Sequence, residues 1–219
     1  VIQTGITRPG FYRLFLTAES GGHSLTRELR TASIERVPPG DSHVGMNHAY
    51  GWPHLLDLCD EAGIRWVRDW SIKWQHVQPK PGPFDFRQTD YQLGRVLDRK
   101  LPLLALLPYS ANDWAADAPA NFERIPRGAL EAGRASLPPK DPAAFGTYAA
   151  AAIGRYGKRV THWEILNEPL HTSYTLPAGL GYKAEDYVRV LKAGYAAAKK
   201  ADPGCTVIGG IGGHPLLYM

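Results

Sequence analysis

Two polar residues, Asn167 and Glu168, follow an apolar run in the stretch 163–169, whose sequence is WEILNEP. The apolar residues predict a buried strand, and Pro169, which has no N–H group for a strand ladder, predicts its end. Ligands of α/β proteins bind at the carboxyl ends of strands, where both side chains would lie. A carboxyl group partly removed from water there can keep its proton near neutral pH, as a general acid must. We therefore expect Glu168 to be catalytic rather than an exposed or paired carboxylate.

Further polar residues are expected on the same side of the predicted strands. Arg68 lies near the end of a strand predicted over residues 64–68, and side chains alternate between the two faces of a strand. The same alternation places His162 and Glu164 on the face of Glu168. For Glu164 we favour an internal network, with Arg68 as its partner, over a catalytic role. The alternative for Arg68 is an ordinary surface cation.

Aromatic residues follow the second and third predicted strands: Trp70, Trp74, Tyr109 and Trp114. Aromatic rings at such positions are natural platforms for apolar C–H faces of the kind that sugars present, so at least one of the four is expected to stack on the ligand if it is a sugar. Trp114, in the long segment after the third strand, is the first choice, and the alternative is packing of the rim. Two histidines, His48 and His171, follow the first and fourth strands and are predicted polar contacts of the ligand.

The elements that would position these residues alternate between strand and helix. Strands are predicted over residues 43–47, 64–68, 101–107, 160–166 and 205–208, and helices over 51–62, 88–99, 142–156 and 185–201. This alternation predicts a parallel sheet built of βαβ units. The segments after the strands are long and those before them short, which is typical of a (β/α)₈ TIM barrel with its site on the long loops. Because such a barrel has eight strands, we expect this one to be truncated after about the fifth.

Residues 1–40 form a different unit. Phe11–Leu16 reads as a strand, Glu19–His23 as a turn and residues 25–37 as a second strand, which together predict a β-hairpin. A lone hairpin is marginally stable, so this one is predicted to be the C-terminal hairpin of an accessory β-sandwich domain. Residues 41–219 are then the N-terminal part of the barrel domain. The start at Val1 suggests a piece of a longer protein.

Composition excludes several classes of function. Hydrophobic residues make up 44% of the 219 and the formal charge is +4, without a basic cluster interleaved with aromatics, so no nucleic acid is expected. No apolar run is long enough to span a membrane. The eight His lack metal-ligand spacing, and residues 210–215 lack the third glycine of a dinucleotide fingerprint, so neither metal nor cofactor is expected. Cys59 and Cys205 are predicted to be buried and unpaired.

Residues 163–169 resemble the Asn-Glu-Pro motif of clan A, the retaining β/α-barrel glycoside hydrolases. The resemblance covers about residues 41–214 and includes Trp74, Gln78, Pro79, Gly82, Phe84, Phe86 and Asp90. Residues 182–187 and 201–203 resemble the β-xylosidase/α-L-iduronidase family and cellulase-like relatives. The resemblance implies that the motif ends the fourth strand, Glu168 is the acid/base, Asn167 hydrogen-bonds the sugar and Arg68 supports a nucleophilic Glu. It places that nucleophile on the seventh strand, outside this chain.

The expected function is glycosidase activity on an oligo- or polysaccharide by retaining double displacement, with the chain alone inactive and poorly soluble. The substrate class favours a secreted or periplasmic setting; sugar, linkage and oligomeric state stay open. One alternative is a pseudo-enzyme that binds carbohydrate without cleaving it. Another is an esterase that uses Ser42, although residues 40–42 follow two prolines rather than a strand and no matching Asp-x-x-His is present.

Overall fold

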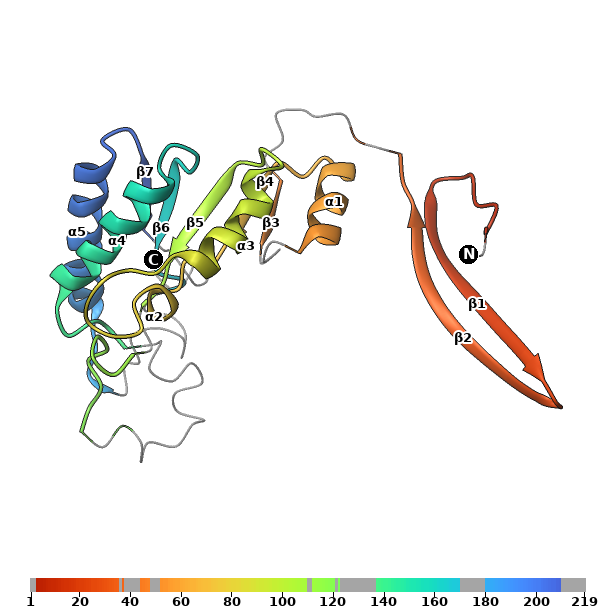
Figure 1. The fold of residues 1–219 in the computed structure, drawn as a ribbon, viewed down its shortest axis with the longest axis horizontal. Helices are drawn as coiled ribbons and strands as arrows, with labels where there is room; N and C mark the ends of the chain where they lie inside the picture. Colours follow the sequence, from red (N-terminus) through yellow and green to blue (C-terminus); the bar gives the residue numbers. More distant parts are fainter. Residues whose placement is uncertain are drawn as a thin grey trace, which may run out of the picture.

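A computed structural model of the chain describes residues 3–35, 37, 44–47, 52–109, 112–120, 122, 137–169 and 180–209. The described residues form two parts, a long β-hairpin and an α/β unit, which Figure 1 shows joined by a single connection. The α/β unit positions every described residue of the candidate site.

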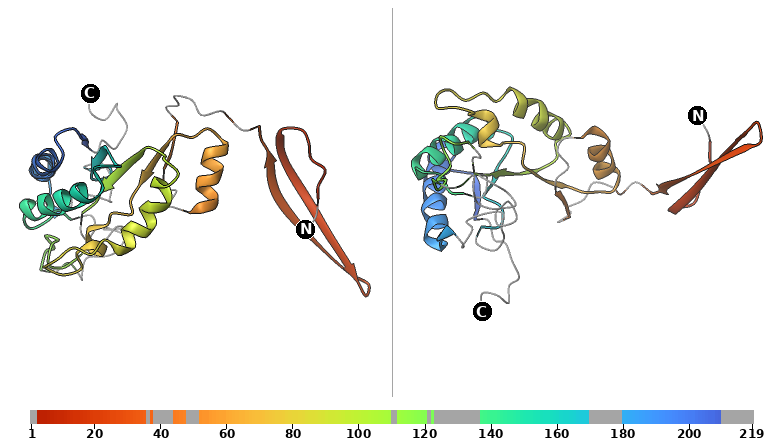
Figure 2. Two further views of the ribbon diagram at one scale, coloured as in Figure 1. Left: turned by 45° about the horizontal axis from the view of Figure 1, so that its top comes forward. Right: turned by 90° about the horizontal axis from the view of Figure 1, so that it is seen from below.

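The hairpin consists of β1 (Gly10–Ser20) and β2 (His23–Ser33). Ser20 pairs with His23, so the loop has two residues, Gly21 and Gly22, both with positive φ. This is the geometry that a tight hairpin turn requires, and the predicted hairpin is confirmed. Its strands extend away from the α/β unit (Figures 1 and 2), and apolar side chains such as Phe15 are largely exposed. Membership of a β-sandwich domain stays a prediction.

The α/β unit is built on a five-stranded parallel sheet in the order β3-β4-β5-β6-β7. The strands are Gly45–Asn47, Trp66–Asp69, Leu103–Leu107, His162–Ile165 and Thr206–Gly209. Each strand pairs with the next along the chain, as in a β/α barrel, whereas a doubly wound sheet reverses its order at a switch point. The predicted parallel sheet and its strand count are confirmed. Its closure by further strands stays a prediction.

The helices are α1 (Pro53–Glu61), α2 (Trp74–Val77), α3 (Arg87–Leu97), α4 (Pro142–Tyr156) and α5 (Ala184–Ala201). Four of them match the predicted helices to within two residues at each end. The start of α4 has a simple cause: Pro142 suits the first helical turn, and the Asp141 carboxylate accepts a hydrogen bond from the Ala143 N–H at 2.8 Å. The single turn α2 was not predicted, because four residues are too few to show helical periodicity.

The two faces of the sheet differ in character. On one face, side chains such as Val67, Ala105 and Trp163 are buried in a single core together with α3, α4 and α5, which lie along that face in Figure 2. The helices pack closely against the sheet: a Cβ atom on Gly194 of α5 would lie 2.7 Å from Cδ1 of Ile165 in β6. The alternate residues of the strands, Arg68 and Glu164 among them, point to the opposite face. This opposite face, here called the polar face, also carries Leu104 and Leu106, which pair in register with Arg68 and Glu164.

Candidate active site

The predicted polar residues gather at the carboxyl end of the sheet. Arg68 lies in β4, and Asn167 and Glu168 follow β6 within three residues. Tyr109 follows β5 in the same way. Parallel strands end at one edge of a sheet, so these residues share that edge. The other two predicted contacts, His48 and His171, lie outside the described residues.

Arg68 connects the members of the cluster. Its Nε donates to Glu164 Oε2 at 2.6 Å and its Nη2 to Glu164 Oε1 at 2.8 Å, which makes a two-point ion pair. The same Nη2 donates to Asn167 Oδ1 at 2.9 Å, and Nη1 donates to Asn47 Oδ1 at 3.1 Å. The predicted pairing of Glu164 with Arg68 is thus confirmed. The Arg68 guanidinium thus connects its own strand, β4, to β3 through Asn47 and to β6 through Glu164.

This cluster is mostly removed from solvent. The side chain of Arg68 is 21% exposed and that of Glu164 is 10% exposed. The guanidinium carbon also lies 5.4 Å from the ring centroid of Trp70, within the range of a cation–π interaction. A cation and a carboxylate in such a setting are held in place by charge and by directional hydrogen bonds together. The Arg68–Glu164 pair is thus a constrained, mostly buried ion pair in contact with Asn167, the residue before Glu168.

The backbone after β6 departs from the predicted strand. The strand ends at Ile165, and both Leu166 and Glu168 have positive φ, 64° and 43°. These values are uncommon for residues other than glycine and are often found at functional sites. They correct the expectation that alternation runs unbroken to Glu168. The turn brings the side chain of Asn167, which alternation would place opposite Glu164, to Arg68 on the polar face.

Two of the predicted sugar contacts are core residues in this structure. Trp74 is 0% exposed, stacks on Tyr148 and donates from Nε1 to Gln78 Oε1 at 2.8 Å. Tyr109 is 2% exposed, and burial raises the pKa of its hydroxyl well above the usual value, with Tyr187 adding to the effect. Neither ring offers a face to a ligand here. Their burial supports the alternative interpretation, packing of the barrel rim.

Trp114 is only half-buried, so it is better placed to contact a ligand than the buried Trp74 and Tyr109. Its Nε1 donates to the Gln78 carbonyl at 3.3 Å, and its ring meets Trp74 edge-on. The same carbonyl accepts from Asn112 Nδ2 at 2.9 Å, and the Tyr182 hydroxyl donates to the Asp117 carbonyl at 2.6 Å. These bonds connect the segment after β5 to the segments after β4 and β6. Its placement is therefore fixed by the neighbouring loops.

Sequence reasoning missed Asn47 as a member of the cluster and gave Trp70 a different role. Asn47 pairs in register with Arg68, so its position on the neighbouring strand could have been inferred had the register been known. Trp70 was considered only as a sugar platform, while the structure places it against the Arg68 guanidinium. Register between strands is a long-range property, and a single sequence gives no direct signal for it.

Other features of the described residues lie away from this cluster. No group of His, Cys, Asp and Glu side chains suited to a metal ion occurs in the described ranges, and none of the helices there is long and apolar enough to cross a membrane. Cys59 and Cys205 are buried and free, as predicted.

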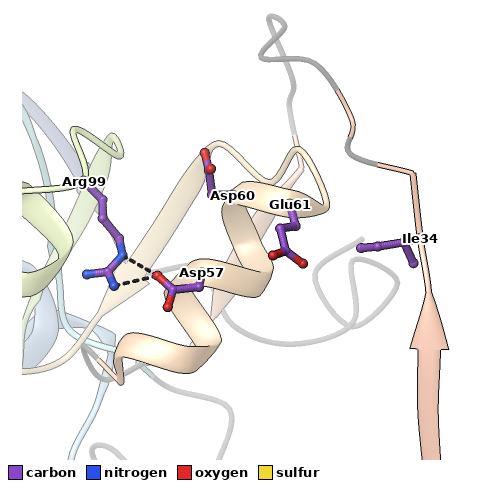
Figure 3. Close-up of a pocket in the computed structure, with 5 residues that line it drawn as sticks. All are labelled: Ile34, Asp57, Asp60, Glu61 and Arg99. Carbon is purple, nitrogen blue, oxygen red and sulfur yellow. Dashed lines mark hydrogen bonds and ion pairs between the residues drawn. The ribbon is translucent and has the colours of Figure 1, made fainter. Parts of the chain in front are cut away.

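A pocket of about 580 Å³ lies between the hairpin end and α1 (Figure 3), lined by Ile34, Asp57, Asp60, Glu61 and Arg99. Its acidic side chains alone do not define a ligand.

No protein-family model matches the chain. Among curated proteins, the chain is 26% identical to Beta-glucosidase 4 of Oryza sativa subsp. japonica over 156 residues, which are 71% of this chain and 30% of that protein. A second match, Beta-glucosidase 42 of Arabidopsis thaliana, is 27% identical and covers 59% of this chain. The chain thus spans between a quarter and a third of the length of the curated relatives it matches.

Solved structures give a broader match. A family 39 glycoside hydrolase from the gut symbiont Bacteroides cellulosilyticus WH2 superposes on 93% of this chain and 39% of its own, with a TM-score of 0.62 and 23% identity. The GH39 enzyme from Xanthomonas axonopodis pv. citri covers 79% of this chain and 36% of its own, with a TM-score of 0.54 and 18% identity. The predicted resemblance to clan A glycoside hydrolases is confirmed at the level of the fold. The parallel sheet is similar to those of glycoside hydrolase TIM barrels.

Proposed function

We propose that this chain is part of a retaining glycosidase in which Glu168 is the general acid/base. The observation that carries the proposal is the hydrogen bond that fixes Asn167, the residue next to Glu168. Asn167 is held by Arg68 at 2.9 Å, at the carboxyl edge of a sheet similar to those of glycoside hydrolase barrels. An amide and a carboxyl group side by side, above a rigid cation, can bind a sugar hydroxyl and protonate a glycosidic oxygen at the same time.

The chemistry has two steps. In the first, a carboxylate nucleophile attacks the anomeric carbon while the Glu168 carboxyl group gives its proton to the departing glycosidic oxygen, and a covalent glycosyl ester forms. In the second, the Glu168 carboxylate takes a proton from water, which attacks the same carbon and releases the sugar and the nucleophile. The two carboxyl groups of a retaining enzyme lie about 5–5.5 Å apart. We propose that the nucleophile is a Glu outside this chain, on the seventh strand of the complete barrel.

Substrate contacts are assigned to residues with a face or a polar group at this edge. Asn167 and Arg68 are proposed to bind the sugar at the scissile bond, with His48 and His171 as further polar contacts. Trp114, which is half-buried and anchored through Gln78, is the proposed aromatic platform. Trp74 and Tyr109 support the rim from beneath because both rings are buried. The substrate is an oligo- or polysaccharide, whose C–H faces suit such a platform.

The isolated chain is proposed to be inactive and poorly soluble. Among the described residues at this edge, Glu164 is engaged with Arg68, and the Asp69 carboxylate accepts a hydrogen bond from the Ser71 N–H at 2.6 Å. Neither is placed to act as a nucleophile. The hairpin of residues 10–33 exposes apolar side chains, which fits the proposal that it belongs to an accessory β-sandwich.

The test uses the longer protein and three forms of residue 168. The wild type should hydrolyse aryl glycosides with retention of configuration. Glu168→Gln should lose most turnover on substrates with poor leaving groups, by about 10²–10⁴-fold, and keep its sugar affinity. Glu168→Ala should be accelerated by azide, a nucleophile that needs no general base, and should yield a glycosyl azide of retained configuration.

Wild-type turnover by Glu168→Gln on a poor leaving group would refute the assigned role. A second candidate is carbohydrate binding without cleavage, which fits one observation: the carboxylates of Glu164 and Asp69 at this edge are engaged by Arg68 and by the Ser71 N–H. Sugar binding by a longer protein that shows no turnover on any glycoside would support that candidate instead.

A further inference from the structure

We propose that Glu164 is a positioning residue of this site, which acts through Arg68 to fix Asn167 beside Glu168. The inference rests on the proposed function for its catalytic consequence and on the geometry for its physical basis. Glu164 lies below the catalytic edge, in β6, and is 8% exposed. It is therefore argued to influence the reaction without contact with the substrate.

The ion pair between Glu164 and Arg68 determines an orientation as well as a distance. Arg68 lies in β4 and Glu164 in β6, with β5 between them, so the Arg68 side chain crosses a whole strand to reach its partner. Both carboxylate oxygens of Glu164 are engaged, one by Nε at 2.6 Å and one by Nη2 at 2.8 Å. Two parallel bonds to a planar guanidinium fix its plane, which a single bond would not.

That fixed plane determines what Asn167 presents. The second hydrogen of Nη2 is directed at Asn167 Oδ1, 2.9 Å away, so the carbonyl end of the amide is held by Arg68. The opposite end of the Asn167 amide is its NH₂ group, a hydrogen-bond donor. Asn167 also lies between Leu166 and Glu168, whose φ values are 64° and 43°. The bond to Arg68 thus restrains the turn that presents Glu168.

Stability alone is a weak explanation for this ion pair. Removing two charges from water has a desolvation penalty that often exceeds their attraction, and apolar replacements of buried pairs are frequently neutral or stabilising. The Arg68 cation has further partners, since Nη1 also donates to Asn47 Oδ1 at 3.1 Å. A guanidinium whose donors bind groups from β3, from β6 and from the turn after β6 is suited to hold a precise arrangement. Loss of Glu164 would remove the two bonds that fix the plane of the Arg68 guanidinium, which holds Asn167, the residue before Glu168.

A mutant cycle on activity tests the route through Asn167. In the longer protein, Glu164→Gln should lower kcat/KM by up to about 10²-fold, the effect of a small misplacement. If Glu164 acts through Asn167, the double variant E164Q/N167A should be no slower than N167A alone. Asp90→Asn, which breaks a carboxylate–arginine pair on the helical side of the fold, is the matched control and should keep wild-type kinetics. Fully additive losses in E164Q/N167A would overturn the proposal.

A second measurement decides the inference whether or not the protein turns over substrate. In the longer protein, ¹⁵N-asparagine labelling makes the side-chain NH₂ groups observable; this chain contributes four asparagines, of which Asn47 and Asn167 accept from Arg68. The Asn167 pair, assigned by its loss in Asn167→Asp, should shift in Glu164→Gln and stay unchanged in D90N. If E164Q does not fold, Glu164→Asp, which keeps the charge on a shorter side chain, should shift the same pair. Unchanged Asn167 signals would overturn the positioning role, whereas a wild type without glycosidase activity would refute only the proposed function.

Discussion

Replacing Trp74 tests whether the aromatic residues after the second strand bind sugar or stabilise the barrel wall. The Trp74 ring is 0% exposed, lies parallel to Tyr148 with centroids 5.2 Å apart and meets Phe145 edge-on at 5.9 Å. Its Nε1 donates to Gln78 Oε1 at 2.8 Å, and Gln78 is itself buried. Trp74→Ala would therefore remove core packing and leave a buried acceptor without its donor.

The magnitude follows from these contacts. A buried Trp removes roughly 200 Å² from water, which at about 25 cal/mol per Å² corresponds to about 5 kcal/mol; measured truncations of this kind cost about 3–5 kcal/mol. The unpaired Gln78 oxygen adds about 1–3 kcal/mol. We expect Trp74→Ala to lower the free energy of unfolding by about 4–8 kcal/mol, which is comparable to the whole stability of a marginal domain. Trp74→Phe keeps the stacking and loses the donor, so we expect about 1–3 kcal/mol.

Urea unfolding and sugar affinity, both measured on the same variants of the longer protein, separate a role of Trp74 in sugar binding from a role in stability. Trp52 is 53% exposed, and Trp52→Phe should change stability by no more than about 0.5 kcal/mol. Trp74→Phe should unfold at lower urea than this control and bind sugar like the wild type. The reasoning is refuted if Trp74→Phe retains wild-type stability and loses tenfold or more in sugar affinity.

Three further predictions concern the ion pairs and the turn after β6. Arg68→Met leaves Glu164 unpaired and should destabilise the protein by about 3–5 kcal/mol, while R68M/E164M should regain most of that loss in urea unfolding; a double variant as unstable as R68M would contradict this. The Arg155 guanidinium, and secondarily the Tyr156 hydroxyl, lower the pKa of Asp90 below its ordinary 3.8, so its stabilising effect is present above that value and lost as pH falls through the folded pKa. The stability advantage of wild type over Asp90→Asn should accordingly shrink in acid unfolding between pH 5 and pH 2, about the range over which such a carboxylate titrates, and a constant difference would oppose it. Leu166→Gly should destabilise the protein in thermal unfolding, although Lys100→Gly, at a position of similar φ, should not.

The sequence predicts the α/β unit well because its signals are local. The apolar run at residues 101–107 marks a strand covered by helices, and Pro142 with Asp141 marks a helix start. The pairing of Arg68 with Glu164 was also predictable, because alternation within each strand places both on the same face. Such inferences need only the periodicity of apolar residues along the chain and the residues that mark the ends of helices and strands.

Features that depend on contacts between distant segments were not predictable in this way. Trp74 follows a strand, as a ligand platform would, and only the positions of Phe145 and Tyr148 on α4 show that it is buried. The same holds for Asn167. Its bond to Arg68 requires a turn with positive φ at Leu166, and no glycine marks that turn in the sequence. The alternation rule therefore failed in the turn after β6, where Asn167 and Glu168 lie.

The turn at Leu166 shows why a strained conformation can persist there. A non-glycine residue with φ of 64° costs of order 1–3 kcal/mol, which glycine would relieve. The Leu166 side chain is 1% exposed, however, and deleting a buried leucine costs about 3–5 kcal/mol. Burial outweighs strain, so Leu166→Gly should lose about 1–3 kcal/mol. Lys100 has φ of 56° at the exposed end of α3, where glycine relieves strain without loss of packing, and Lys100→Gly should be neutral or stabilising by up to about 1 kcal/mol. The opposite signs at two similar backbone positions would show that core packing holds the turn that presents Asn167 and Glu168.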